Sequence, residues 1–198
     1  MNTDPDVNLM LAYANGEEKA FRELFARHHK HIINFCYRFC FDRGVAEELA
    51  QEVFIRVYQA AGRYRPDARF STWLYRIAVN LCLNESRKRK YKVRIESMDQ
   101  PVYMGNPESV REIEDGESLS PQEMVEAGER EKLIQQAMRA LPEEQRAALL
   151  LRVFNDFSYE EIAKQMAISE TKVKSLIYKG RKRLQDLLAG YFKNGRAS

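Results

Sequence analysis

Residues 158–188 read SYEEIAKQMAISETKVKSLIYKGRKRLQDLL, and this stretch decides the class of fold. Ser158 and Glu161 have the spacing of a capping box, in which a hydroxyl and a carboxylate satisfy free amides at the start of a helix. The pattern predicts a short helix that ends at Met166, a tight turn, and a longer helix from Glu170 to about the end of the stretch. These proportions are typical of a helix-turn-helix, whose second helix enters the major groove of DNA.

The longer of these two helices separates apolar from cationic side chains. Its packed side is predicted to hold Val173, Leu176, Ile177, Gly180, Leu184, Leu187 and Leu188. The opposite side presents Thr171, Lys174, Ser175, Tyr178, Lys179 and Lys182. No carboxylate lies between Glu170 and Asp186, whereas a helix that is merely solvated normally mixes both signs of charge. The pattern favours DNA binding, because cations neutralise phosphates and hydroxyls reach base edges; a solvated basic face is the alternative.

The rest of the chain also predicts helices, because apolar residues recur every three or four positions and Gly and Pro fall mostly between these runs. We predict an all-α protein of two small helical domains joined by an acidic flexible linker, the second domain containing the helix-turn-helix. The predicted segments are a first domain at 1–94 with helices at about 17–39, 45–61 and 71–90, a linker at 95–119, and a four-helix domain at 120–198. We expect the linker to let the two domains move independently. The first helix should bury a stripe of Phe21, Leu24, Phe25, His28, Ile32, Phe35, Cys36 and Phe39.

Charge is divided unevenly between these segments. Residues 1–94 carry 17 basic and 11 acidic side chains, residues 95–119 carry 1 and 7, and residues 120–198 carry 14 and 11. Two basic domains on either side of an acidic segment favour a polyanion as the binding partner, with both domains in contact with it.

Several classes of protein are excluded by motif and composition. The sequence contains no Walker loop, dinucleotide-binding glycine fingerprint, nucleophile elbow or His-Glu-x-x-His pair, so we expect neither an enzyme nor a cofactor. It shows no secretory leader and no apolar run near the roughly 18 residues that cross a bilayer, so we expect a cytoplasmic protein without membrane insertion.

The segment that joins the second and third helices is predicted to bind single-stranded nucleic acid. Residues 62–69 read GRYRPDAR, and arginines around an aromatic ring can hold a backbone while the ring stacks on a base. The third helix continues this surface as a polar strip of Arg76, Asn80, Asn84 and Arg87. The alternative is that Tyr64 and Trp73 are hydrophobic plugs.

The second helix carries one apolar residue on its polar side. Leu49, Ala50, Val53, Phe54 and Val57 form its core stripe, and opposite them stand Glu48, Gln51, Glu52, Ile55 and Gln59. Ile55 is therefore centred on an acidic and amide face, which predicts a docking site for a protein helix with basic residues.

Four runs in this order resemble a known family: AEELAQEVFIRVYQ (46–59), ARFSTWLYRIAVNLCLNESRKRK (68–90), LPEEQRAALLLRVFNDFSYEEIAKQMAI (141–168) and TKVKSLIYKGRKRL (171–184). They are similar to bacterial RNA polymerase sigma factors of the extracytoplasmic-function (ECF) group, sigma-70 family group 4, which have regions 2 and 4. The resemblance covers residues 9 to 190 and implies that 1–94 is region 2 and 120–198 is region 4. It implies an alternative sigma factor that directs promoter-specific initiation of transcription.

The resemblance also implies roles for individual residues. The residues implied to bind polymerase are Glu48, Gln51, Glu52, Ile55 and Arg56. The residues implied to recognise and melt the minus-10 element are Arg63, Tyr64, Arg65, Arg69, Trp73, Arg76, Asn80 and Asn84. The residues implied to recognise the minus-35 element are Lys172, Lys174, Ser175, Tyr178, Lys179, Arg181 and Lys182. The implied partners are core RNA polymerase through its beta-prime clamp helices and beta flap, promoter DNA as duplex and as melted non-template strand, and an anti-sigma factor.

Two other functions remain open from the residues alone. A conventional helix-turn-helix regulator would not dock on core polymerase, and an adaptor would engage acidic proteins instead of DNA. The first helix also gathers His28, His29, His31, Cys36 and Cys40, whose spacing matches no zinc module. We favour packing for these side chains and expect no metal, with a redox or metal sensor as the alternative.

Overall fold

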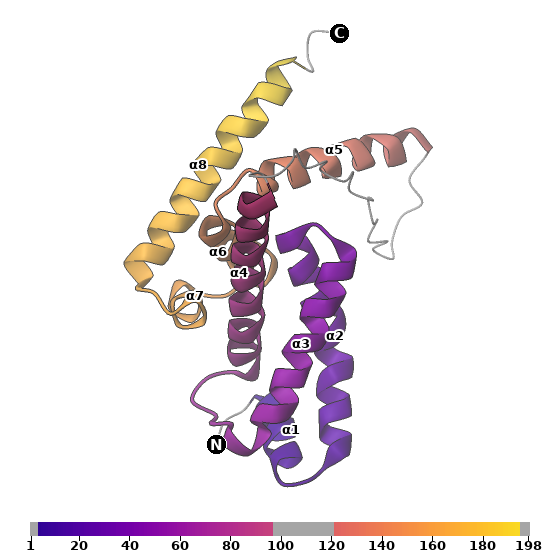
Figure 1. Ribbon diagram of the computed structural model, residues 1–198, viewed down its shortest axis with the longest axis vertical. Coiled ribbons are helices and arrows are strands. Elements are labelled where there is room, and N and C mark those ends of the chain that lie inside the picture. The colour runs from indigo at the N-terminus through magenta and orange to yellow at the C-terminus, as the bar shows by residue number, and fades with distance from the viewer. Residues whose placement is uncertain (1–3, 97–120, 195–198) are drawn as a thin grey trace.

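The computed structural model of the 198-residue chain describes residues 4–96 and 121–194. These residues form eight α-helices and one short 3-10 helix, and no strand occurs among them, which confirms the all-α prediction (Figure 1). The elements are α1 (Pro5–Ala14), α2 (Glu18–Cys40), α3 (Arg43–Ala60), η1 (Ala61–Arg63), α4 (Phe70–Glu96), α5 (Pro121–Arg139), α6 (Glu143–Phe154), α7 (Tyr159–Met166) and α8 (Glu170–Asn194).

Helices α2, α3 and α4 pack side by side as the N-terminal domain, and α1 lies across one end of them (Figure 1). Their shared core includes Leu24, Ile32, Val53, Phe70 and Leu74, all fully buried. The core stripe predicted for α3 is confirmed, because each of its five residues is buried. The three helices predicted from the sequence are therefore present, with ends that differ by a few residues.

Helix α1 was not predicted from the sequence, and one carboxylate explains its position. Asp4 caps α1 by accepting a hydrogen bond from the Asp6 amide at 3.0 Å, and Pro5 follows at the first helical position. The second oxygen of Asp4 accepts from the backbone amide of Phe70 at 2.9 Å, at the start of α4. Because Val7 is fully buried, α1 belongs to the core of the domain.

Helix α4 is longer than predicted. Helix α4 continues to Glu96, so residues 95 and 96 are helical, and the rest of the predicted linker lies outside the described residues. Helix α8 is also longer than expected, since it runs to Asn194.

Helices α5 to α8 form the C-terminal domain and confirm the predicted four helices. Leu150, Leu151, Ile162, Val173 and Ile177 are buried in its core. Helix α8 approaches α6 closely at Gly180, where a Cβ atom would stand 2.7 Å from Cδ1 of Leu149. A glycine at this position therefore lets the long helix lie against α6.

The two domains are in contact, whereas the sequence predicted domains that move independently. Helix α7 lies against α4, and α6 lies against both α2 and α4 (Figure 1). Arg146 of α6 is the most buried charged side chain at this contact, with 8% of its surface exposed. Its guanidinium donates to the carbonyl oxygen of Phe39 in α2 at 2.7 Å.

The same guanidinium also holds the end of α5 within its own domain. It donates to the carbonyl oxygens of Met138 at 2.9 Å, Arg139 at 2.8 Å and Leu141 at 3.0 Å. The last carbonyls of a helix have no partner within the helix and carry partial negative charge. One cation therefore satisfies the C-terminal ends of two helices from two domains.

We predict that Arg146→Ala lowers the free energy of unfolding by about 3 kcal/mol, because hydrogen bonds from a charged donor are lost and buried carbonyls are left unpaired. Urea denaturation followed by circular dichroism measures this change. Arg152→Ala is the matched control, since Arg152 is half-buried and donates to the Phe157 carbonyl at 3.2 Å. Equal losses for the two variants would contradict the dual role of Arg146.

Candidate nucleic-acid interface

The helix-turn-helix predicted for residues 158–188 is present as α7 and α8. The Ser158 hydroxyl accepts from the Glu161 amide at 3.2 Å, and the Glu161 carboxylate accepts from the Ser158 amide at 2.9 Å, which completes the predicted capping box. Helix α7 ends at Met166, and its C-cap residue Ala167 has a φ of 54°, which lies in the left-handed region. Ser169 then accepts from the Lys172 amide at 3.3 Å and starts α8.

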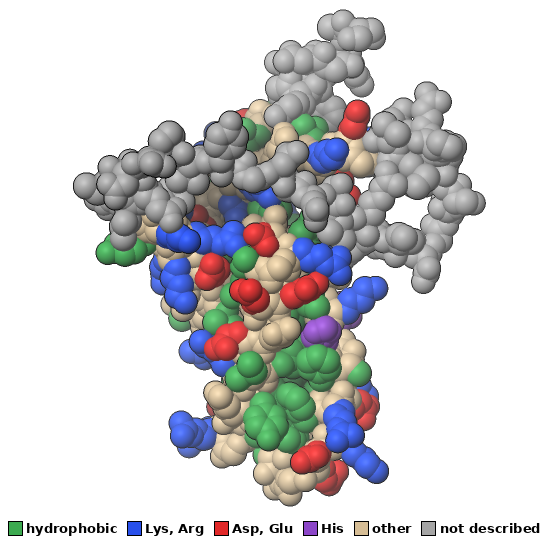
Figure 2. Space-filling model, turned by 45° about the vertical axis from the view of Figure 1, so that its right-hand side comes forward, with side chains coloured by type: hydrophobic (Ala, Val, Ile, Leu, Met, Phe, Trp, Pro, Cys, Tyr) green, Lys and Arg blue, Asp and Glu red, His purple; other side chains and the backbone are tan. Residues whose placement is uncertain are grey.

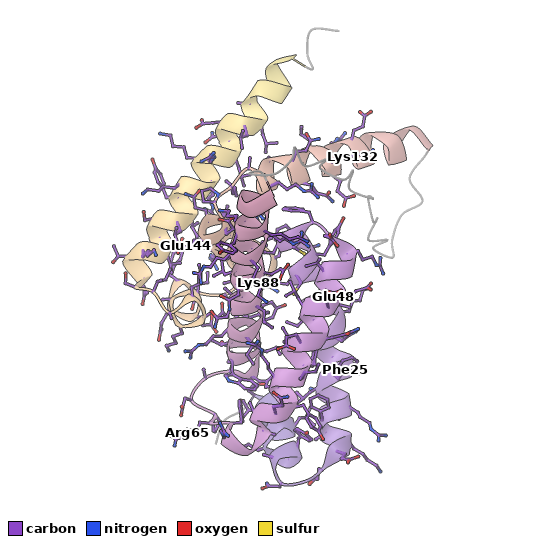
Figure 3. The ribbon with its side chains drawn as sticks, in the orientation of Figure 1. Phe25, Glu48, Arg65, Lys88, Lys132 and Glu144 are labelled. Carbon is purple, nitrogen blue, oxygen red and sulfur yellow. The ribbon has the colours of Figure 1, made fainter. Side chains whose placement is uncertain are left out.

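The face of α8 predicted to read DNA is exposed along its length (Figure 3). Tyr178 has 68% of its surface exposed, and Val173 and Ile177 are buried on the opposite side. Two of the cations are oriented by neighbours: Lys172 pairs with Glu144 at 3.1 Å, and the ammonium of Lys174 lies 5.9 Å from the centre of the Tyr159 ring. The residues predicted for minus-35 recognition are all exposed: Lys172, Lys174, Ser175, Tyr178, Lys179, Arg181 and Lys182.

The arginine-rich loop between α3 and α4 divides into exposed cations and packed rings. Arg63, Arg65 and Arg69 are exposed, and Figure 3 shows Arg65 directed away from the bundle. Tyr64 and Trp73 are half-buried, with their ring centres 5.0 Å apart. Burial, together with the negative charges of Asp4 and Asp67, raises the pKa of Tyr64 to about 12. The loop therefore presents guanidinium groups to solvent and keeps its aromatic rings largely against the domain.

Helix α4 extends this surface as the sequence predicted. Arg76, Asn80 and Asn84 are exposed and lie four residues apart, so they share one side of the helix. The Asn84 side chain accepts a hydrogen bond from Arg87 at 3.3 Å. The loop and the polar strip together form one polar surface, which begins at the start of α4 and continues along this helix.

The face of α3 predicted to bind polymerase is also exposed. Ile55 has 49% of its surface exposed, and Glu48, Gln51 and Arg56 are exposed around it. Glu52 is half-buried and accepts from Arg56 at 2.8 Å. Figure 3 shows Glu48 on the outer side of α3.

An aromatic patch beside this face was not predicted. The rings of Tyr13, Phe21 and Tyr58 meet with centres 4.9 to 5.6 Å apart, and Phe25 stacks on His29 at 4.4 Å. The sequence placed Phe21 and Phe25 in the core stripe of α2, but Phe21 is half-buried and Phe25 is 37% exposed. Figure 2 shows a group of apolar side chains here, below a group of carboxylates. Helical periodicity misassigned these two residues. It identifies the apolar side of a helix, but it does not show how far along that side the neighbouring helices extend to cover it.

The three cysteines are thiols that pack mainly within the N-terminal domain, as favoured from the sequence. Cys36 and Cys82 are buried with their sulfur atoms 3.7 Å apart, and Cys40 is half-buried and donates to the Cys36 carbonyl at 2.9 Å. His28 contacts the Asp6 carboxylate at 2.7 Å. Within residues 4–96 and 121–194, no group of three or more His, Cys, Asp or Glu side chains could hold a metal ion.

Two family models match this chain in the order of its domains. The model described as Sigma-70 region 2 matches residues 24–91, and the model described as Sigma-70, region 4 matches residues 131–184. The RNA polymerase sigma-H factor of Pseudomonas aeruginosa is 33% identical over 194 residues, which cover 95% of this chain and 98% of the relative. The ECF RNA polymerase sigma factor SigW of Bacillus subtilis is 31% identical over 173 residues, covering 87% and 91% of the two chains.

Two solved structures have the same fold. The sigma factor RpoE of Bartonella quintana, solved in complex with the anti-sigma factor NepR, has a TM-score of 0.67 at 22% identity and covers 86% of this chain and 98% of its own. CnrH, solved in complex with the cytosolic domain of CnrY, has a TM-score of 0.66 at 20% identity. The match covers 94% of this chain and 99% of the CnrH chain.

The fold, the two domain matches and the relatives together define a sigma-70 family RNA polymerase sigma factor with regions 2 and 4. More particularly, the chain belongs to the ECF sigma factors. It is thus an alternative sigma factor, a protein that joins core RNA polymerase and directs promoter-specific initiation of transcription. Among the helices that the structure describes, none is long and apolar enough to span a bilayer.

We predict that the native thiols alkylate slowly. Burial raises the pKa of Cys40 from near 9 to about 11, partly offset by a backbone hydrogen bond with Asp42, so its thiolate fraction at pH 8 falls about 100-fold. A pulse of iodoacetamide followed by mass spectrometry should label Cys40 slowly, and Cys36 and Cys82 more slowly still, until urea is added. Rapid native labelling of Cys36 or Cys82 would instead favour an accessible sensor site.

Proposed function

We propose that the two domains of this sigma factor divide the promoter between them. The observation that supports this most directly is the exposed α8 face, which has seven polar or cationic residues and no carboxylate between Glu170 and Asp186. The C-terminal domain, residues 120–198, reads the minus-35 element as duplex through this face. The residues proposed to read it are Lys172, Lys174, Ser175, Tyr178, Lys179, Arg181 and Lys182.

The N-terminal domain, residues 1–94, is proposed to open the minus-10 element. The exposed guanidinium groups of the loop hold the backbone of the melted non-template strand, and the strip along α4 contacts its bases. Capture of flipped bases offsets an unstacking cost of a few kcal/mol per step. The proposed residues are Arg63, Tyr64, Arg65, Arg69, Trp73, Arg76, Asn80 and Asn84. Tyr64 and Trp73 are half-buried, so both have to turn outward before a base can stack on them.

The exposed face of α3 is proposed to dock on core polymerase. Ile55 supplies an apolar centre, and the surrounding carboxylates attract basic residues on a partner helix. The residues are Glu48, Gln51, Glu52, Ile55 and Arg56. The chain acts in the cytoplasm, where polymerase works, and contributes binding energy without a catalytic centre of its own. Since the two structural neighbours were solved with anti-sigma or cytosolic partner domains, we propose that an anti-sigma factor binds this chain as well.

Run-off transcription with purified core polymerase tests this proposal. An initiation factor yields transcripts of defined length from a promoter with both elements, whereas a conventional helix-turn-helix regulator yields none with core enzyme alone. The absence of transcripts from genomic promoter fragments together with tight duplex binding by the free chain would favour the regulator.

The docking face generates one specific prediction. Ile55→Arg should weaken binding to core polymerase at least about 10-fold, because it replaces an apolar contact by a cation facing a basic partner. Fluorescence anisotropy of the labelled chain titrated with core measures the affinity. Val153→Arg is the matched control, since Val153 is 54% exposed on α6, outside the three proposed faces. Unchanged core binding by the Ile55 variant would remove α3 from the docking site.

The α8 face generates a second prediction. Lys179→Ala should weaken binding to a minus-35 duplex and reduce by about 1 the slope of the logarithm of affinity against the logarithm of salt, because one phosphate contact is lost. Lys19→Ala removes an exposed cation from α2 and should change neither value. Filter binding with core polymerase present supplies both measurements. If the salt dependence of binding has the same slope in both variants, α8 is not the helix that contacts the DNA phosphates.

A further inference from the structure

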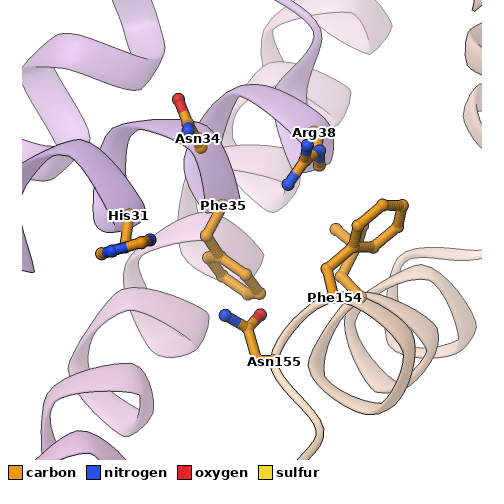
Figure 4. Close-up of a pocket in the computed structure, with 7 residues that line it drawn as sticks. His31, Asn34, Phe35, Arg38, Phe154 and Asn155 are labelled. Carbon is orange, nitrogen blue, oxygen red and sulfur yellow. The ribbon is translucent and has the colours of Figure 1, made fainter. Parts of the chain in front are cut away.

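A small cavity lies between α2 and the end of α6, where Phe35 and Arg38 face Phe154 and Asn155 (Figure 4). Its volume of about 50 Å³ has room for only a few water molecules, so it cannot admit a nucleotide base. A more informative feature stands at the opposite end of α2, where α1 lies against the loop proposed to open the minus-10 element (Figure 1).

Helix α4 follows this loop and begins after a residue that cannot cap it. Arg69 is at the N-cap position, because its carbonyl accepts a helical hydrogen bond from the Trp73 amide at 3.3 Å. A capping side chain needs an oxygen atom, which Ser, Thr, Asp and Asn have and arginine lacks. A cation is also unfavourable at this end, where free amides carry partial positive charge. The start of α4 therefore benefits from an anionic acceptor supplied by another part of the chain.

Asp4 supplies this acceptor from 66 residues away. One oxygen of its carboxylate accepts a hydrogen bond from the Phe70 amide, the first amide of α4, at 2.9 Å. The other oxygen accepts from the Asp6 amide at 3.0 Å and caps α1. Hydrogen bonds to an ionised acceptor are about twice as strong as neutral ones. One anion thus joins the first turns of two helices, at the end of each where negative charge is stabilising.

A second contact from α1 reaches the side chain of the same residue, Phe70. Asp6 contacts His28 at 2.7 Å, and the His28 ring lies 5.3 Å from the Phe70 ring, which is fully buried. Phe70 also packs against Tyr64 and Trp73, with ring centres 6.4 and 5.9 Å away. The aromatic rings of the minus-10 surface therefore rest on a residue that α1 holds by its amide and, through His28, by its ring.

Both ends of the loop are held against α1. The 3-10 helix η1 contacts α1 where the loop begins, and the bond from the Phe70 amide to Asp4 holds the loop where it ends. Between these two points Arg65 and Arg69 are exposed. The distance of their guanidinium groups from the polar strip along α4 depends on the path of the loop backbone, and α1 fixes that path.

We propose that Asp4 is a positioning residue for promoter opening. By capping α4 from α1, it allows an arginine to occupy the N-cap position and aligns the loop with the strip along α4. The inference rests on the proposed function, because only a loop that binds the melted strand needs this alignment. Without the bond to Phe70, the loop takes up several positions, and the apparent affinity for the melted strand falls with the fraction of chains in the aligned one.

Two matched variants separate this role from simple stabilisation. Asp4→Ala removes the bond to the Phe70 amide together with the cap of α1. Asp42→Ala removes the cap of α3, where Asp42 accepts from the Val45 amide at 3.0 Å, at the end of α3 that is far from the loop. Each variant deletes a carboxylate that caps a helix of the N-terminal domain, so each should lower the midpoint of urea unfolding. Neither residue belongs to a surface proposed to bind polymerase or DNA.

The affinity for the melted strand decides between the two roles. The probe is a labelled single-stranded oligonucleotide with the minus-10 non-template sequence of a promoter that yields run-off transcripts. Fluorescence anisotropy measures its binding to the full chain on core polymerase. Asp4→Ala should weaken this binding about 10-fold, whereas Asp42→Ala should leave it unchanged, and both should keep the wild-type affinity for core. Equal effects of the two variants, or none from Asp4→Ala, would overturn the proposal.

Two further variants keep the result interpretable. If Asp4→Ala also loses core binding, Asp4→Asn replaces it: this side chain has the same size but lacks the charge and one acceptor, so the oligonucleotide should still bind more weakly than to wild type. Arg63→Ala with Arg65→Ala tests the loop itself. If this pair weakens oligonucleotide binding and neither Asp4 variant does, the positioning role alone is wrong. If the arginine pair has no effect, the proposed minus-10 surface is wrong as well.

Discussion

The guanidinium of Arg146 holds together parts of the chain that are far apart in sequence. It donates to carbonyls at the ends of α5 and α2, and it lies over the rings of Phe39 and Phe41 at 5.3 and 5.2 Å. A buried cation is stable only where acceptors surround it, and two helix termini supply them. The position of α6, and with it the orientation of α7 and α8, depends on this contact.

The proposed division of tasks rests on the faces that this packing leaves exposed. The core uses one side of α3, α4 and α8, and the opposite sides carry the apolar and acidic face around Ile55, the polar strip along α4 and the cations of α8. Each face lies on a rigid helix, so its side chains keep a fixed spacing toward polymerase or DNA. The proposed recognition of two promoter elements needs, in addition, a set separation between the face on α4 and the face on α8.

The sequence was sufficient where structure is local, and insufficient where distant groups decide it. The capping box at Ser158, the buried stripe of α3 and the exposed face of α8 follow from residues within one or two turns of one another. Helix α1 depends on the bond from Asp4 to the Phe70 amide, 66 residues away, and the domain contact depends on backbone carbonyls such as that of Phe39. Backbone amides and carbonyls leave no mark in the sequence, so the distant partners of Asp4 and Arg146 could not be predicted.

In the proposed function, two separate domains of one chain read two promoter elements at a separation fixed by core polymerase. Run-off transcription from a series of promoters whose spacer is lengthened by 0, 5 and 10 base pairs measures whether this separation is required. Five base pairs turn one element by half a helical turn relative to the other, so we expect transcripts to be lost already at that insertion. Transcription that persists unchanged across the series would contradict it.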